Sequence, residues 1–161
     1  MFDFERASAW LGKSIEVEGS AETGSSNVTW LVRVGAVSAV LRHPPDGPRL
    51  ATAHDLAREH LFLTALSGQS LPVPAPIAFC EESGIAGVPF LIVERAPGIC
   101  LLRDELGDVD GAALARSAVD TLAALHAVDW RARGLHSRSG SYLERQVERW
   151  KRQLHETPTS G

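Results

Sequence analysis

The sequence predicts an α+β fold in which an antiparallel sheet with one packed helix comes first and further helices follow. Three observations support this prediction. Residues 15–21, 27–34 and 37–42 alternate apolar and polar side chains and are joined by short connections, as neighbouring antiparallel strands are. Residues 53–67 carry apolar side chains at helical spacing. From Asp110 onward, alanine and leucine recur with the same helical period.

The first elements are a short helix and a meander of three strands. Residues 3–12 place Phe4, Ala7, Trp10 and Leu11 at helical spacing, and Gly12 stops the helix. The strands follow, with a turn expected at Gly35-Ala36. A proline-rich segment, residues 43–48, ends the third strand because proline cannot continue a hydrogen-bonded ladder.

The next element is a helix over residues 53–67. Thr52 is its expected N-cap, and Asp55 in the first turn suits the helix dipole. Gly68 closes the helix. Its expected buried stripe consists of Leu56, Phe62, Leu63 and Leu66.

Two more strands and two more helices complete the prediction. Residues 77–80 and 88–95 are expected to form a hairpin around Ser83-Gly84 and Gly87. Helices are expected over residues 110–126 and 141–155. The second of these helices is expected to turn Tyr142, Val147, Trp150 and Leu154 inward.

Composition narrows the class of protein. A chain of 161 residues with 44% apolar and 22% charged residues has the size and composition of an ordinary globular domain. Its net charge is −4, and no stripe of basic residues that could bind nucleic acid stands out. No apolar run approaches the roughly 20 residues that cross a bilayer, and the N-terminus lacks a signal peptide. We therefore expect a cytoplasmic protein with no nucleic-acid or membrane partner.

The two cysteines, Cys80 and Cys100, lie far apart and show no CxxC spacing. This pattern argues against a disulfide framework and against a zinc site. We expect both cysteines to be small buried apolar side chains.

A small polar segment between the first two strands suits a phosphate. Gly24-Ser25-Ser26-Asn27 offers backbone N–H groups and hydroxyls without bulky side chains. It is not a P-loop, because the lysine is missing and a strand rather than a helix follows. The alternative is an ordinary hairpin turn.

A cation and a carboxylate come next in the order that a nucleotide pocket requires. Arg42, at the end of the third strand, could neutralise phosphates, since arginine stays charged and binds oxyanions through two parallel hydrogen bonds. Glu59, on the following helix, is its natural partner. The alternatives are a surface arginine on an edge strand and a solvated helix carboxylate.

The buried strand Phe90-Leu91-Ile92-Val93 runs abruptly into Glu94-Arg95 and then Ala96-Pro97-Gly98. Adenine recognition needs a carbonyl and an N–H group two residues apart on backbone that has left its sheet. Proline and glycine just after the strand free the backbone in this way. The alternative is a strand that simply enters a turn.

Taken in order, these segments resemble the aminoglycoside/choline phosphotransferase family, and most closely the phosphotransferase domain fused to acyl-CoA dehydrogenases. The resemblance covers nearly the whole chain. The matching stretches are Gly24–Trp30, Val40–Pro45, Ala53–Glu59, Val73–Pro76, Pro89–Glu94, Leu122–Asp129 and Arg145–Trp150.

The resemblance implies a protein-kinase-like fold with a nucleotide-binding small lobe at residues 1–98 and the first helices of a large lobe at residues 99–161. It implies ATP with Mg²⁺ as the donor and a small-molecule hydroxyl as the acceptor, such as a hydroxylated acyl-CoA or a similar alcohol. The implied site residues are Ser25, Ser26 and Asn27 in the phosphate loop, Arg42 on the phosphates with Glu59 behind it, and the Glu94 carbonyl and Ala96 N–H on adenine.

The sequence departs from the family in one respect. The family's H-G-D…N catalytic loop and its later metal-binding Asp have no counterpart among the residues up to Gly161. No catalytic residue or metal ligand is therefore assigned. Positioning and charge stabilisation supply nearly all of phosphoryl-transfer catalysis, so we expect this polypeptide alone to be inactive.

Three hypotheses follow from the sequence. The chain could be the N-terminal part of a small-molecule kinase, truncated before its catalytic loop. It could be a non-catalytic nucleotide-binding or protein-interaction module whose helices are covered by a partner chain or by a second copy. It could also be a plain α+β structural domain. The first two share an expectation that Leu122, Leu125 or Trp150 is exposed when the chain is alone.

Overall fold

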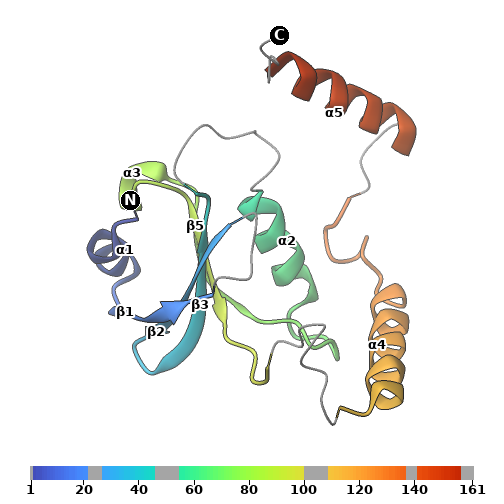
Figure 1. Ribbon diagram of the computed structural model, residues 1–161, viewed down its shortest axis with the longest axis horizontal. Coiled ribbons are helices and arrows are strands. Elements are labelled where there is room, and N and C mark those ends of the chain that lie inside the picture. The colour runs from blue at the N-terminus through green and yellow to red at the C-terminus, as the bar shows by residue number, and fades with distance from the viewer. Residues whose placement is uncertain (1, 22–26, 46–54, 100–108, 137–140, 157–161) are drawn as a thin grey trace.

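The computed structural model describes residues 2–21, 27–45, 55–99, 109–136 and 141–156, and its centre is a five-stranded antiparallel sheet (Figure 1). The strands lie in the order β1-β2-β3-β5-β4, so the last two in sequence exchange places at one edge. Their bounds are β1 (Ile15–Ser20), β2 (Val28–Val34), β3 (Val37–His43), β4 (Pro76–Cys80) and β5 (Phe90–Glu94).

The predicted meander is confirmed by the first three strands. The β2 and β3 strands pair without interruption from Val28↔His43 to Val34↔Val37. Gly35, at the expected turn between them, has a φ of 58°, a left-handed conformation that glycine adopts without steric cost. The β1–β2 ladder contains a register shift between Val17 and Gly19, a β-bulge that alternation in the sequence did not reveal.

One face of the sheet is covered by helices α1 (Phe4–Leu11) and α3 (Ser83–Ala86). The predicted first helix is confirmed: the Asp3 side chain caps it by accepting from the Arg6 N–H, and Gly12 ends it with a φ of 67°. The apolar core on this face includes Ala7, Ile15, Val32, Val34, Ala39, Leu41, Phe90 and Ile92.

Helix α2 (Leu56–Leu66) covers the other face, where Leu56 packs with Leu91 and Val93. The helix begins three residues later than expected, and its N-cap is Asp55 rather than Thr52, which lies outside the described residues. A carboxylate caps as well as a hydroxyl does, so the sequence offered two starts. Phe62 was wrongly assigned to the buried stripe, because it is 40% exposed with the Arg58 guanidinium over its ring.

Between β4 and β5 the structure has a short helix, α3, in place of the predicted hairpin turn. Glycines at positions 84 and 87 were interpreted as turn residues, but only Gly87 adopts a positive φ, of 87°. Residues 83–86 instead wind into one helical turn that buries Ala86 against α1. The loop thus contributes to the core.

Helices α4 (Gly111–His126) and α5 (Tyr142–Glu156) follow the sheet and lie apart from it in Figure 1. No side chain of α4 is buried. The predicted exposure of Leu122, Leu125 and Trp150 is confirmed. The inward orientation expected on the last helix is wrong, since Tyr142, Val147, Trp150 and Leu154 are between 51% and 71% exposed. Among the described residues, no element packs closely enough to cover them.

Candidate functional site

The α2 face of the sheet brings Arg42 and Glu59 together. Side chains alternate across β3, so that Ala39 and Leu41 enter the α1-side core while Arg42 projects to the α2 side. There Arg42 Nη1 donates to Glu59 Oε1 in an ion pair. The two residues that sequence order predicted as partners are in contact.

The start of α2 explains why Glu59 reaches the sheet. Asp55 accepts from the Arg58 N–H at 2.9 Å, which fixes the first helical turn. Leu56 is buried against Leu91 and Val93, and Glu59 lies one turn later on the same side of the helix. The packing of the first turn therefore aims the Glu59 carboxylate at the end of β3.

The pair is only partly desolvated, because the side chains of Arg42 and Glu59 are 40% and 27% exposed. Such a pair contributes about 1 kcal/mol or less to stability. Its main effect is to orient the guanidinium, which has five N–H donors and uses one of them on Glu59. The remaining donors form no hydrogen bond to a residue that the structure describes, and they can bind an oxyanion.

The base of the predicted phosphate loop lies at the same end of the sheet. Thr29 is the partner of Arg42 in the β2–β3 register. The Ala21 N–H donates to the Thr29 carbonyl at 2.9 Å, so pairing with β2 continues past the end of β1. Asn27 follows as a half-buried residue just before β2. Ser25 and Ser26 lie outside the described residues.

The backbone predicted to bind adenine, residues 94–96, leaves the sheet immediately after β5. The Glu94 N–H donates to the Ala75 carbonyl at 2.9 Å, and the Arg95 N–H donates to the Ser38 carbonyl at 3.0 Å. Ala96 is exposed, and its N–H makes no hydrogen bond to any residue that the structure describes. The chain is thus anchored up to Arg95, and the next backbone donor is open to a ligand.

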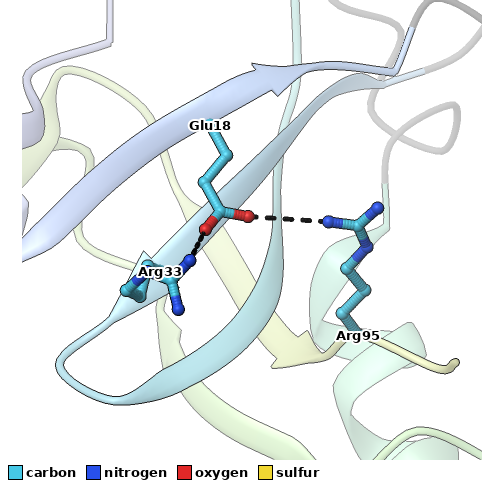
Figure 2. Close-up of polar contacts among 3 residues, drawn as sticks. All are labelled: Glu18, Arg33 and Arg95. Atoms are coloured by element: carbon cyan, nitrogen blue, oxygen red, sulfur yellow. Dashed lines mark hydrogen bonds and ion pairs between the residues drawn. The ribbon is translucent and has the colours of Figure 1, made fainter.

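A second charged cluster on this face was not predicted (Figure 2). Glu18 on β1 accepts from Arg33 Nη2 on β2 through its Oε1, and its Oε2 lies 3.5 Å from Arg95 Nη1. The β1–β2 register places Glu16 rather than Glu18 opposite Arg33, so cross-strand pairing of opposite charges gave no signal for Glu18. The register shift after Val17 and the return of residue 95 to the sheet could not be read from the sequence.

Other polar groups do not form a competing site among the described residues. Cys80 is buried, as expected, and burial raises the pKa of its thiol, which disfavours the nucleophilic thiolate. Cys100 lies outside the described residues.

No group of three His, Cys, Asp or Glu side chains in the described part of the chain could hold a metal ion. The same described residues include no helix with the length and hydrophobicity of a membrane span.

Two cavities, of about 280 and 380 Å³, lie between the end of α2 and residues 124–133. They are lined by parts of the segments 61–71 and 124–133. Neither contains a predicted site residue.

Comparison with known proteins places residues 20–159 within the phosphotransferase enzyme family. The chain is 34% identical over 143 residues to acyl-CoA dehydrogenase family member 10 of Mus musculus, covering 86% of this chain and 13% of that protein. It is 37% identical over 137 residues to acyl-CoA dehydrogenase family member 11 of Gallus gallus, covering 81% of this chain and 17% of the relative. The chain therefore spans less than a fifth of these relatives.

A solved structure shares the fold. The crystal structure of an inferred aminoglycoside phosphotransferase from Ralstonia eutropha superimposes with a TM-score of 0.70 at 28% identity. The match covers all of this chain and half of that one.

Proposed function

Because this chain belongs to the phosphotransferase enzyme family, we propose that it is the nucleotide-binding part of an ATP-dependent small-molecule kinase that phosphorylates a hydroxyl group. The predicted resemblance and the α+β, protein-kinase-like fold are confirmed by the family match and by the shared structure. ATP use, the acceptor and the roles of individual residues are the proposal.

The observation that carries the proposal is the Arg42–Glu59 ion pair on the α2 face of the sheet. A strand cation held by a helix carboxylate is the arrangement that kinase-like folds use on nucleotide phosphates. Arg42 has guanidinium donors to spare, and Thr29 at the base of the Gly24-Ser25-Ser26-Asn27 segment is its neighbour on β2. The phosphates would lie between this segment and Arg42.

The remaining roles follow from this placement. Ser25, Ser26 and Asn27 would contact phosphate oxygens, while the Glu94 carbonyl and the Ala96 N–H would bind the adenine edge. We propose residues 1–98 as the nucleotide-binding lobe and residues 99–161 as the beginning of a helical lobe. A cytoplasmic location fits the use of ATP.

Magnesium would accompany ATP in such a site, where it neutralises charge on the phosphates. The described residues include no cluster suited to hold the ion. We therefore assign no metal ligand within them, and propose Arg42 as the side chain that neutralises phosphate charge in this part of the protein.

We further propose that this 161-residue polypeptide does not transfer phosphate by itself. Its sequence has no His-Gly-Asp segment to orient an acceptor hydroxyl. Without that positioning, bound ATP has no activated nucleophile. Incubation with γ-labelled ATP and a panel of alcohols should give no labelled product, and transfer to any alcohol would contradict this part of the proposal.

For the acceptor of the complete enzyme we propose a hydroxylated acyl-CoA or a similar alcohol. The support is the kinship with proteins named as acyl-CoA dehydrogenases. The exposed apolar side chains of α4 and α5 favour a second candidate function, a non-catalytic nucleotide-binding module that acts through a protein partner. Both candidates predict that this chain binds ATP without transferring phosphate. They differ in what covers the exposed apolar side chains of α4 and α5, which is the rest of the enzyme in the first candidate and a protein partner in the second.

The decisive experiment is calorimetric titration of the chain with ATP and Mg²⁺. Charge-assisted hydrogen bonds stabilise by more than neutral ones, so Arg42→Ala should raise the Kd for ATP by about tenfold or more. Arg58→Ala is the matched control, because Arg58 lies beside Glu59 on α2 but contacts the Phe62 ring instead. Equal ATP affinity in the Arg42→Ala variant and the unaltered chain would overturn the assignment.

A further inference from the structure

The cluster of Glu18, Arg33 and Arg95 lies on the face of the sheet that carries Arg42. Arg33 follows Val32 and precedes Val34, which both enter the α1-side core, so its side chain projects to the α2 side. Figure 2 shows the Glu18 carboxylate between the two guanidinium groups. One side chain of β1 thereby contacts both β2 and the segment after β5.

Both the backbone and the side chain of Arg95 are held at one corner of the sheet. Ser38 is the β3 partner of Arg33, and its carbonyl accepts from the Arg95 N–H at 3.0 Å. The Arg95 guanidinium reaches back to Glu18. The next residue is Ala96, the proposed adenine donor, whose N–H has no partner among the described residues.

We propose that Glu18 is a positioning residue for adenine: by holding Arg95 against β1 and β2, it fixes the direction in which the backbone leaves β5 and so aims the Ala96 N–H at the base. This inference rests on the proposed nucleotide-binding function. It adds to that function a residue on a different strand, which does not itself touch the nucleotide.

The ion pairs of Glu18 are suited to orienting the backbone after β5 rather than to stabilising the fold. The side chains of Glu18, Arg33 and Arg95 are 26%, 46% and 43% exposed, and exposed ion pairs add little to folding free energy. The Glu18 carboxylate nevertheless restricts the movement of the backbone after β5, because it pairs with two arginines from separate elements. This restriction does not require any of the three charges to be buried.

A purely electrostatic role for Glu18 predicts a different outcome. Its carboxylate lies on the face expected to receive a polyanion, and removing it would leave two unpaired arginines there. ATP binding would then become tighter, while uncharged adenosine would be unaffected. Loss of positioning would instead weaken adenosine binding. The two ligands therefore separate the two roles.

The test is titration of the Glu18→Gln variant with adenosine and with ATP. We expect the Kd for adenosine to rise about two- to fivefold, the scale that partly exposed ion pairs support. Glu16→Gln, with the same change of charge on the same strand and no ion pair to a described residue, should leave it unchanged. In an Arg95→Gln background, Glu18→Gln should have no further effect on adenosine.

A second measurement does not depend on ligand binding. Hydrogen exchange at the Arg95 amide should be faster in Glu18→Gln than in Glu16→Gln, because the bond to Ser38 opens more often. Unchanged adenosine affinity in Glu18→Gln, or equal exchange in the two variants, would overturn the inference. If the unaltered chain bound neither adenosine nor ATP, the proposed function would fail, and Arg95 exchange would still decide whether Glu18 orients the segment.

Discussion

At the scale of single residues, the sheet depends on a polar pair, the buried His43 and the half-buried Trp30, that alternation in the sequence cannot reveal. The Trp30 indole N–H donates to His43 Nε2 at 3.1 Å, and His43 Nδ1 lies 2.7 Å from the Pro44 carbonyl. Because an indole can only donate, Nε2 must accept, and the proton of the neutral ring is on Nδ1. The His43 ring also stacks on Phe2, with centroids 4.9 Å apart.

We predict that His43→Phe lowers the free energy of unfolding by about 1–3 kcal/mol, because an aromatic ring stays but the half-buried Trp30 N–H loses its acceptor. Urea denaturation measures the change. His60→Phe is the control, since the His60 ring stacks on Phe79 with centroids 5.0 Å apart and its side chain forms no hydrogen bond to a described residue. An equal loss in both variants would show that the hydrogen bond contributes nothing.

The candidate site illustrates what residue order can and cannot predict. Arg42 and Glu59 were predicted as partners because a strand cation followed by a helix carboxylate is a recognisable sequence of parts, and the structure brings them into contact. Glu18 carried no such signal, because charged residues on an edge strand usually face solvent. Its contact with Arg95 depends on a register shift and on the path of the chain after β5.

At the scale of elements, helix α2 connects folding to the candidate site. Its first turn carries the Asp55 cap, the buried Leu56 and the site residue Glu59. A change in the cap therefore reaches the ion pair through only four residues of helix. Another long helix, α4, is capped by the Asp110 side chain in the same way but carries no site residue.

We predict that Asp55→Ala costs about 1 kcal/mol of stability and also weakens ATP binding, because the first turn of α2 frays and Glu59 no longer holds Arg42. Thermal unfolding and ATP titration measure the two effects. Asp110→Ala removes a comparable cap from α4 and should leave the Kd for ATP unchanged. A similar loss of ATP affinity in both variants would argue against a specific link through α2.

Strands were easier to predict than the loop between the last two. Alternation predicted β1, β2 and β3 to within about a residue. The strands β2 and β3 bury side chains of one face in the α1-side core, whereas β1 buries only Ile15. The order of β5 and β4 at the sheet edge is set by long-range pairing that no local pattern encodes. The helix α3 was missed because its Ser-Gly-Ile-Ala sequence has turn residues, and only packing against α1 decides the outcome.

At the scale of the whole molecule, the chain divides into a packed sheet and two helices with exposed apolar side chains. On α5, Leu143, Val147, Trp150 and Leu154 follow one another at spacings of four, three and four residues, which forms a single stripe. In an antiparallel pair of α5 helices from two copies, Glu144 of one would flank Lys151 of the other. The stripe and its charges suit self-association.

We therefore predict that the chain associates with a second copy as its concentration rises, and that Trp150→Gln shifts the equilibrium toward the monomer. Light scattering during size-exclusion chromatography measures the mass. Arg152→Gln, on the polar side of α5, is the control and should associate like the unaltered chain. A monomer at all concentrations would contradict the prediction.

Whether the α2 face of the sheet binds ATP is decided by a map of backbone amide shifts by NMR during titration with ATP and Mg²⁺. We expect shifts to concentrate on the α2 face of the sheet and at the exit of β5, with Asn27, Arg42, Glu59 and Ala96 among the most affected. The absence of any shift at saturating ATP, or shifts confined to the cavities lined by residues 124–133, would contradict this expectation.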